Sequence, residues 1–505
     1  MTKRTVHALA LVLSATPLLL VGCGDSGNNN GTGGSGGGGG VGGTIKNDGG
    51  GGAGGAKLDV GVPDVVPPAV DTAPVIDVAV PIDTSPVVDA AIADAPISPD
   101  VPIVIDTGKL DAPAPNDLVM DDTTPAIDTT VVACTITPRF TGGPVNADLT
   151  LSKDCSPYAI AENITVNGNA TLTIEAGATL SFDPDVGIWI SYSTAAKLVA
   201  VGTAASPIVF TSTNTTPTAG DWSGIVLWGN TMGGTQIAYA TLDYCGSSYS
   251  CIHGIGVKPN RVTVDHVAIG HVGPGADGIQ EDNADSNFAI SNSTFSNITA
   301  TPTQQYAISV QAPSFAGIDS TNTFNGGAMI ELAGGTVAVT TDWKTPGTTV
   351  AATSDLRVEG TTTPILTIPA GGTFKFASGT SFWIGYAGAG NLKVNGTQTS
   401  PVVFTSLNAS PTAGDWEGIT LWGAGRATIA YATISYGGLK NGDISVVSDT
   451  NVLDIQNSTL SNSGSYGIGI PCGSAATVTS TGNTFTGNAS GNAGPGPTTG
   501  TVACP

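Results

Sequence analysis

One long stretch of the chain occurs twice. Leu172–Gly229 aligns without gaps on Leu366–Gly423, and 32 of the 58 aligned positions are identical. Self-similarity of this length is the signature of a repeat architecture, in which each unit buries its apolar side only against its neighbours. We therefore expect one extended body made of two related halves, residues 133–331 and 332–505.

Apolar residues in both halves alternate with polar or small ones. The pairs Leu172/Ile174, Leu180/Phe182 and Ile188/Ile190 show this period of two, and Gly or Asn interrupts the runs. Period two indicates strands, and many short strands between turns are typical of a β-solenoid, a sandwich or a barrel.

A shorter repeat separates these three folds. The segment Asn292–Asn297 (NSTFSN) recurs as Asn457–Asn462 (NSTLSN), and each is followed by a shorter echo, at Asn322–Asn325 (NTFN) and at Asn483–Thr486 (NTFT). The spacing from each unit to its echo suits one turn of a β-helix, and Asn tolerates the left-handed bends between its strands. The prediction is an all-β, right-handed parallel β-helix.

The body resembles bacterial surface proteins with pectate-lyase-like β-helix repeats. The resemblance covers roughly residues 140–490 and rests on the pattern GTxxSPxxFTS…GDWxGI and on the NSTF units. It implies the fold, whereas an activity does not follow from a fold.

The N-terminus resembles that of bacterial lipoproteins. Residues 1–22 combine Lys3 and Arg4 with an apolar run too short to span a bilayer, and they end in Leu-Val-Gly before Cys23. The resemblance implies a cleaved signal peptide, acylation of Cys23 and a lipid anchor in the outer membrane of the cell envelope, with the protein facing the surface or the periplasm.

Two linkers are expected between the anchor and the body. Residues 23–56 are rich in glycine and predict a flexible coil, and residues 57–132 hold 12 Pro and 14 Asp, which favours an extended chain.

The net charge of −23 excludes nucleic acid as a partner, because phosphate binding needs a basic surface.

The six cysteines other than Cys23 predict disulfides in an oxidising compartment. Six cysteines allow 15 connectivities. We favour the sequential one, which pairs Cys134 with Cys155, Cys245 with Cys251, and Cys472 with Cys504.

The first half holds an extra segment without a counterpart in the second, about one turn within residues 245–288. By resemblance to lyases of this fold, Lys258 or Arg261 would be the base there, flanked by Asp265 and His266. Calcium prefers six to eight oxygen ligands, and the candidate ligands are Asp277, Glu281, Asp282 and Asp285. The alternative is that these acids line a solvated loop and that His266 only points outward from a strand.

Six of the seven tryptophans are duplicated, as Trp189/Trp383, Trp222/Trp416 and Trp228/Trp422. Equal positions in both halves favour a packing role, and a platform for sugar rings is the alternative. Asp221 and Asp415 are expected to cap turns.

The function that fits these features is a non-catalytic binding or adhesion scaffold for polysaccharide or matrix. The alternative is a calcium-dependent polysaccharide lyase or a glycoside hydrolase that uses the extra turn. No cofactor is expected, apart from possible calcium.

Overall fold

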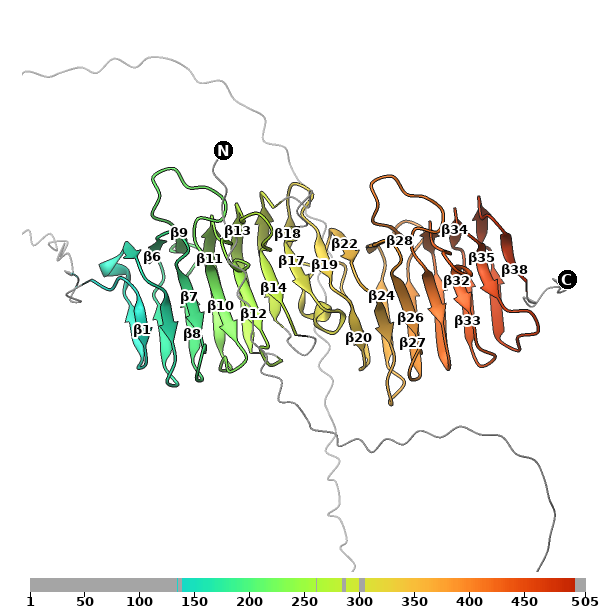
Figure 1. Cartoon of the computed structure of the whole chain (residues 1–505), viewed down its shortest axis with the longest axis horizontal. Helices are drawn as coiled ribbons and strands as arrows, with labels where there is room; N and C mark the ends of the chain where they lie inside the picture. Colours follow the sequence, from blue (N-terminus) through green and yellow to red (C-terminus); the bar gives the residue numbers. More distant parts are fainter. Residues whose placement is uncertain (1–133, 135–138, 260, 284–287, 299–304, 496–505) are drawn as a thin grey trace, which may run out of the picture. The chain divides into compact units, whose positions relative to one another are not determined.

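The computed structural model describes residue 134 and residues 139–259, 261–283, 288–298 and 305–495. The predicted signal peptide, Cys23, both linkers, Asp285 and Cys504 lie outside the described residues. The body is a parallel β-solenoid of about 13 turns (Figure 1), which confirms the predicted parallel β-helix. Its short 3₁₀ helices are η1 (Lys153–Cys155) and η2 (Ala312–Gly317).

One sheet of 14 parallel strands runs through both halves. Its strands, in order, are β1 (Gly143–Val145), β4 (Ile164–Val166), β7 (Gly187–Ile190), β10 (Gly224–Trp228), β12 (Ile252–Ile255), β14 (Ile279–Glu281), β17 (Ile308–Val310), β19 (Ile330–Leu332), β22 (Thr349–Ala352), β25 (Thr373–Phe376), β28 (Val402–Ser406), β31 (Ala432–Ser435), β34 (Thr459–Ser461) and β37 (Thr484–Thr486).

An 11-stranded sheet supplies the other two faces of the first half. It consists of β2 (Leu149–Leu151), β3 (Tyr158–Ile160), β5 (Thr171–Ile174), β6 (Thr179–Phe182), β8 (Lys197–Val201), β9 (Ile208–Ser212), β11 (Thr235–Asp243), β13 (Val262–Gly270), β15 (Ala289–Ser291), β16 (Thr294–Ser296) and β18 (Thr323–Phe324). The long strands β11 and β13 bend at Tyr239 and His266, whose φ angles are 47° and 52°, and so contribute to both faces.

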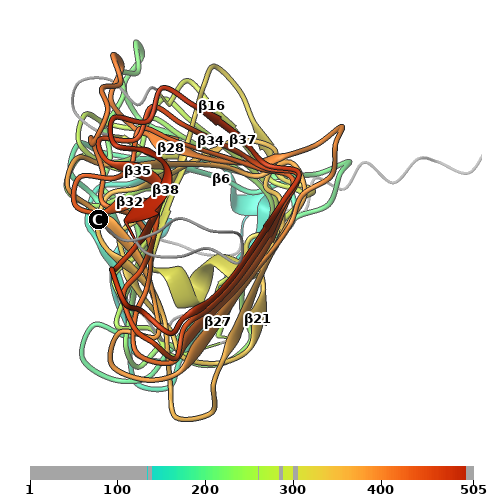
Figure 2. The same ribbon diagram turned by 90° about the vertical axis from the view of Figure 1, so that its right-hand side faces the viewer.

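Two smaller sheets replace it in the second half. One has seven strands: β20 (Gly335–Val337), β23 (Leu356–Val358), β26 (Ser381–Ile384), β29 (Gly418–Leu421), β32 (Gly442–Val446), β35 (Tyr466–Ile470) and β38 (Gly491–Pro495). The other has six: β21 (Thr341–Asp342), β24 (Ile365–Pro369), β27 (Gly390–Asn395), β30 (Gly425–Ala430), β33 (Val452–Gln456) and β36 (Thr477–Thr481). The cross-section is triangular (Figure 2).

Counterpart strands of the two repeats belong to different sheets. β7 lies in the 14-stranded sheet, whereas its counterpart β26 lies in the seven-stranded sheet. The counterpart strands change from one sheet to another at β19 and β20, which only Ala333 and Gly334 separate. The solenoid turn from Ile330 to Val350 is also shorter than the turns on either side of it. β9 and its counterpart β28 still lie along the same edge in Figure 1, and Figure 2 places β6 and β28 on one side. The two repeats therefore share one orientation about the axis.

The core is built from the apolar residues of these alternating runs, whose side chains point inward. Leu172, Leu180 and Ile188 are fully buried, as the period of two predicts. Phe295 pairs in register with Phe324, and their rings stack with centroids 5.2 Å apart. The NSTF spacing is therefore one turn, and apolar side chains stack from turn to turn.

Left-handed bends recur in columns at the corners of the solenoid. Tyr239, His266 and Asn292 form one column with φ near 50°, and Asn457 has the same bend in the second half. The predicted left-handed role of Asn is confirmed at these positions.

Two predicted disulfides, Cys134–Cys155 and Cys245–Cys251, are confirmed. The predicted partner of Cys472 is Cys504, which falls outside the described residues. Within the described ranges, no helix is long and apolar enough to cross a membrane.

Candidate functional site

The predicted base and its neighbours lie at different corners of the extra turn, which consists of β12 and β13. Lys258 and Arg261 belong to the connection between these strands, and Arg261 lies beside Gly233 of the preceding turn. Asp265 and His266 lie at the bend inside β13. Arg261 and Asp265 are four residue steps apart along the strand, about 13 Å at the usual rise.

Asp265 and His266 have partners of their own. His266 Nδ1 lies 2.8 Å from Asp265 Oδ2, and its ring stacks on Tyr239 at 4.4 Å. Burial opposes ionisation of Asp265, but hydrogen bonds from Ser291, Asn292 and His266 outweigh it and lower its pKa. This arrangement orders the bend, and the outward position of His266 agrees with the solvated-strand alternative.

The predicted calcium ligands that the structure describes lie in β14 or next to it. Asp277 precedes the strand and Asp282 follows it, about 16 Å apart along an extended chain. Glu281 is buried and accepts a hydrogen bond from Phe288 N, and Asp282 accepts one from His253 Nε2 at 2.9 Å. In the described part of the chain, no three His, Cys, Asp or Glu side chains are grouped to hold a metal ion. Calcium stays a prediction.

Asp277 is electrostatically unusual. Burial raises its pKa to about 7, against the lowering effect of a hydrogen bond from Tyr306 N at 2.7 Å, and the charge of Glu331 raises it further. A carboxyl group with such a pKa suits proton transfer near neutral pH better than cation binding.

The duplicated tryptophans separate into two classes. Trp222 and Trp416 are fully buried, stack on Phe182 and Phe376 with centroids 4.4 and 4.2 Å apart, and donate from Nε1 to backbone carbonyls. Their predicted packing role is confirmed. The predicted packing role is wrong for Trp422, whose exposed fraction is 44%.

The four other duplicated tryptophans form two surface clusters, each with a tyrosine. The second-half triad is Trp383, Tyr386 and Trp422, in which Tyr386 lies 4.1 and 5.9 Å from the two indole rings. The first-half triad is Trp189, Tyr192 and Trp228, with centroid distances of 5.4 and 5.2 Å. Each triad stands where neighbouring strands end, at β26 and β29 or at β7 and β10.

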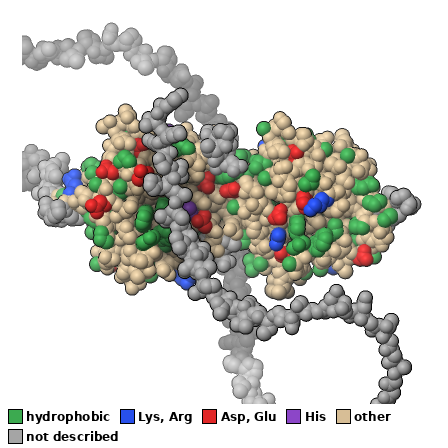
Figure 3. Space-filling view, in the orientation of Figure 1, with side chains coloured by type: hydrophobic (Ala, Val, Ile, Leu, Met, Phe, Trp, Pro, Cys, Tyr) green, Lys and Arg blue, Asp and Glu red, His purple; other side chains and the backbone are tan. Residues whose placement is uncertain are grey.

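A cleft of about 320 Å³ opens beside the second-half triad, on the outer side of the seven-stranded sheet. The floor of the cleft crosses β26, β29 and β32, where Trp383, Thr420 and Ser445 follow one another in register. The side chains along this floor therefore change from a large indole to small hydroxyl groups. In Figure 3, hydrophobic side chains gather beside a few charged ones over this face of the second half.

The charged residues that line the cleft, Lys440 and Glu417, form an ion pair, and Arg357 and Glu359 lie close to its aromatic side. Lys440 Nζ contacts Glu417 at 2.5 Å, and Ser381 Oγ donates to the second oxygen of Glu417. The Arg357 guanidinium lies over the rings of Trp383 and Tyr386 at 5.3 and 5.2 Å, and Glu359 accepts from the nearby Ala387 N. The lining is therefore amphipathic and close to neutral.

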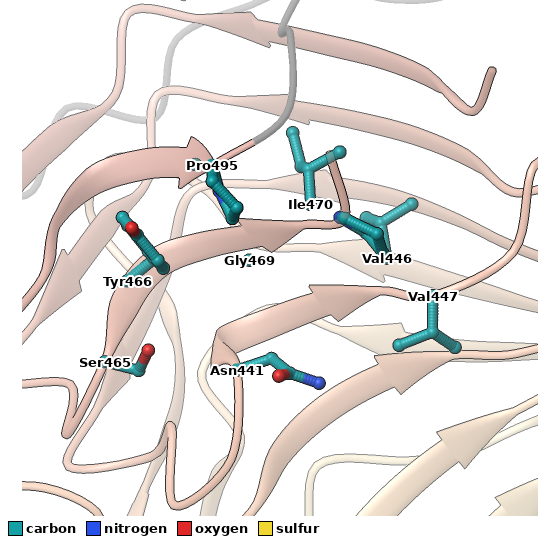
Figure 4. A pocket seen from close by; sticks show the side chains of 10 residues that line it. Asn441, Val446, Val447, Ser465, Tyr466, Gly469, Ile470 and Pro495 are labelled. Carbon is teal, nitrogen blue, oxygen red and sulfur yellow. The ribbon is translucent and has the colours of Figure 1, made fainter. Parts of the chain in front are cut away.

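The cleft continues into a smaller hollow of about 230 Å³ that shares Asn441 and Val447 with it. Figure 4 shows Tyr466 and Pro495 beside Gly469, with Asn441 and Val447, which also line the cleft, below them in the view. Gly469 is the register partner of Ser445, so the floor continues without a side chain. The groove thus runs across successive turns, parallel to the axis.

Sequence reasoning missed the polar half of this cleft. Duplication singled out Trp383 and Trp422, but Arg357, Glu417 and Lys440 belong to no motif. The sequence could have indicated them in one way. They are charged residues in a body with few charges, and each lies near a duplicated tryptophan, either along the chain or one solenoid turn away.

Comparisons with known proteins agree with the architecture. The family model described as the pectate-lyase-like β-helix domain matches residues 143–308 and 336–448, more than half of the chain. Protein bark beetle of Drosophila melanogaster is 46% identical over 71 residues, which are 14% of this chain and 2% of that protein. No solved structure matches the chain.

Proposed function

The chain belongs to the pectate-lyase-like β-helix family, and we propose that its solenoid is a non-catalytic scaffold that binds polysaccharide or matrix glycan. The observation that carries the proposal is the cleft between the second-half triad and the Glu417–Lys440 pair. A sugar ring has an apolar face and hydroxyl edges, so it needs aromatic rings and hydrogen-bonding groups side by side. Trp422 and Tyr386 offer the first, and Thr420, Ser445 and Asn441 the second.

The balance of charge favours a neutral or weakly charged glycan. Arg357 and Lys440 are offset by Glu359 and Glu417, so the cleft has no excess of cations to attract a polyuronate.

The test is binding of the whole protein to an array of neutral and acidic glycans. Trp422→Ala should reduce binding to the best neutral ligands at least about tenfold, because aromatic contacts carry much of such affinities. Val339→Ala removes a side chain that is also exposed but lies outside the cleft, so it serves as the matched control. Equal binding by both variants would overturn the assignment of the cleft.

We also propose that the protein is lipid-anchored through Cys23 in the outer membrane, with residues 23–132 linking the anchor to the body. The signal-like residues 1–22 support this, and the two disulfides fit an oxidising compartment outside the cytoplasm. Cys23→Ala should release the mature protein from the membrane fraction and abolish labelling by a fatty-acid analogue. Unchanged fractionation would overturn the anchor.

The second candidate is a polysaccharide lyase or glycoside hydrolase in residues 245–288. The raised pKa of Asp277 favours it, since a carboxyl group protonated near pH 7 can act as a general acid. Release of unsaturated or reducing sugar ends, with and without calcium, tests both chemistries. Turnover that is lost in Arg261→Ala or Asp282→Ala would support the lyase, and loss in Asp277→Asn alone would support the hydrolase. Binding without turnover would exclude both.

A further inference from the structure

The first-half triad repeats the aromatic part of the cleft. Trp189 and Trp383 occupy equal places in β7 and β26, Trp228 and Trp422 follow them one turn later, and Tyr192 is 54% exposed. Their surroundings differ, because the register partner of Trp189 in the preceding turn is Thr165, where Trp383 has Arg357. The platform is therefore duplicated, but its charged surroundings are not.

Both triads lie on the same side of the solenoid. The sheet exchange between β19 and β20 leaves the repeats in one orientation, and Figure 1 shows β7 and β10 on the front face together with β26. Along this face the chain passes from β7 through β10, β12, β14 and β17 to the β19–β20 pair, and then to β23 and β26. These seven steps place the triads about 34 Å apart at the usual strand spacing.

A row of mostly polar residues continues in register between the triads. In register after Trp189 come Val226, His253, Gln280 and Ser309, and in register before Trp383 come Thr336 and Arg357. Since alternate residues of a strand point to the same side, these side chains lie on the same side of the sheet as Trp189 and Trp383. Val226, His253 and Ser309 are buried there, so Gln280, Thr336 and Arg357 are the partly exposed members of the row.

We propose that the two triads are the ends of one binding face, on which a single linear glycan chain lies parallel to the solenoid axis and contacts both. This inference rests on the proposed function of the cleft and adds that the protein holds one glycan chain at two sites. Once one triad holds the chain, the second contact is intramolecular, so a long chain binds more tightly than either triad alone binds a short one.

The experiment compares short and long ligands on the full-length protein. The probes are hydroxyethyl cellulose, xylan, glucomannan and arabinogalactan, each intact and as tetrasaccharides that are too short to bridge the triads. The proteins are the wild type, Tyr192→Ala, Tyr386→Ala, the double variant and the control Val339→Ala, measured by calorimetry and by light scattering.

Tetrasaccharides should occupy two sites on the wild type and one on each single variant. Intact chains should bind the wild type at least about tenfold more tightly than either single variant, because avidity is lost with either platform. The control variant should match the wild type throughout.

Three results separate the two proposals. If Tyr192→Ala leaves both stoichiometry and long-chain affinity unchanged, the second platform is wrong and the cleft stands. If intact chains become cross-linked and scatter light, the triads hold different chains and the single-chain arrangement is wrong. If no probe binds any of the proteins, the proposed function itself fails, and the inference fails with it.

Discussion

Asp221 and Asp415 hold equivalent loops of the two repeats. Ser406 Oγ donates to Asp415 at 2.7 Å, and Thr412 binds it through both its hydroxyl and its backbone N–H. Thr218 makes the same pair of contacts with Asp221. Burial opposes ionisation of both aspartates, but these hydrogen bonds outweigh it and lower each pKa to about 2. The sequence predicted this capping role, because an Asp before a turn binds local backbone groups.

These two aspartates predict loss of stability in acid. Their folded pKa lies below the unfolded value, so their contribution is complete above about pH 4 and is lost as the pH falls toward 2. Urea midpoints measured from pH 5 to pH 2.5 should fall less steeply for Asp415→Asn than for the wild type. The exposed Asp154→Asn is the control and should follow the wild type, and identical slopes for all three would contradict the prediction.

Asp443 makes the opposite prediction. It is fully buried in β32, accepts from Gly437 N at 2.9 Å, and leaves Oδ2 without a partner among the described atoms. Burial raises its pKa to about 8, against the lowering effect of the backbone hydrogen bonds.

A raised folded pKa means that the contribution of Asp443 to stability is present at low pH and is lost as the pH rises through 8. Asp443→Asn keeps the shape and removes the charge, so its stability relative to the wild type should increase between pH 4 and 8 and then level off. Chemical unfolding at pH 5, 7 and 9 measures this. A constant difference would contradict the buried charge.

At the scale of the elements, the strands follow directly from the sequence. Period two identified inward residues such as Leu172, and the NSTF units predicted the length of a turn. The exchange of sheets at β19–β20 could not be predicted, because it depends on two residues of connection rather than on any change of period. The cleft was missed for a related reason, since Glu417 and Lys440 meet only when the intervening loop folds back.

Buried and exposed members of the tryptophan pairs should differ in their effect on stability. Trp416→Ala should destabilise the body by about 3–5 kcal/mol, because it leaves a cavity against Phe376 and removes the hydrogen bond to Ser435. Trp422→Ala should change stability by less than about 1 kcal/mol, since the indole is partly in water. Unfolding in urea distinguishes the two, and equal losses would place Trp422 in the core.

For the whole molecule, each turn contacts its neighbours only, so stability is a sum of local terms. The first turns are fastened by Cys134–Cys155, which closes a loop of 21 residues and is worth about 3 kcal/mol on the chain-entropy account. The sequence predicted this pairing, and its place suits the end of a solenoid, where exposed strand edges need protection.

Removing that bridge should therefore loosen one end only. In Cys134→Ser/Cys155→Ser, amide exchange should accelerate in β1, β2 and β4, while β28, β31 and β34 keep the rates of the wild type. Hydrogen exchange read by mass spectrometry resolves these segments. Uniform acceleration along the body would show that the turns unfold as one unit.

The hydrogen bonds between turns also determine how the body bears a mechanical load. In a solenoid these hydrogen bonds lie along the axis. A pulling force applied at one end therefore acts on the strands of one turn at a time, and the turns open in sequence. If a glycan is held across seven turns, as proposed above, it would shorten the length of body that such a pull can open. The bridge at Cys134–Cys155 stands at the first point to be loaded from the N-terminal side, where a covalent bond resists a force that the short strands β1 and β2 would not.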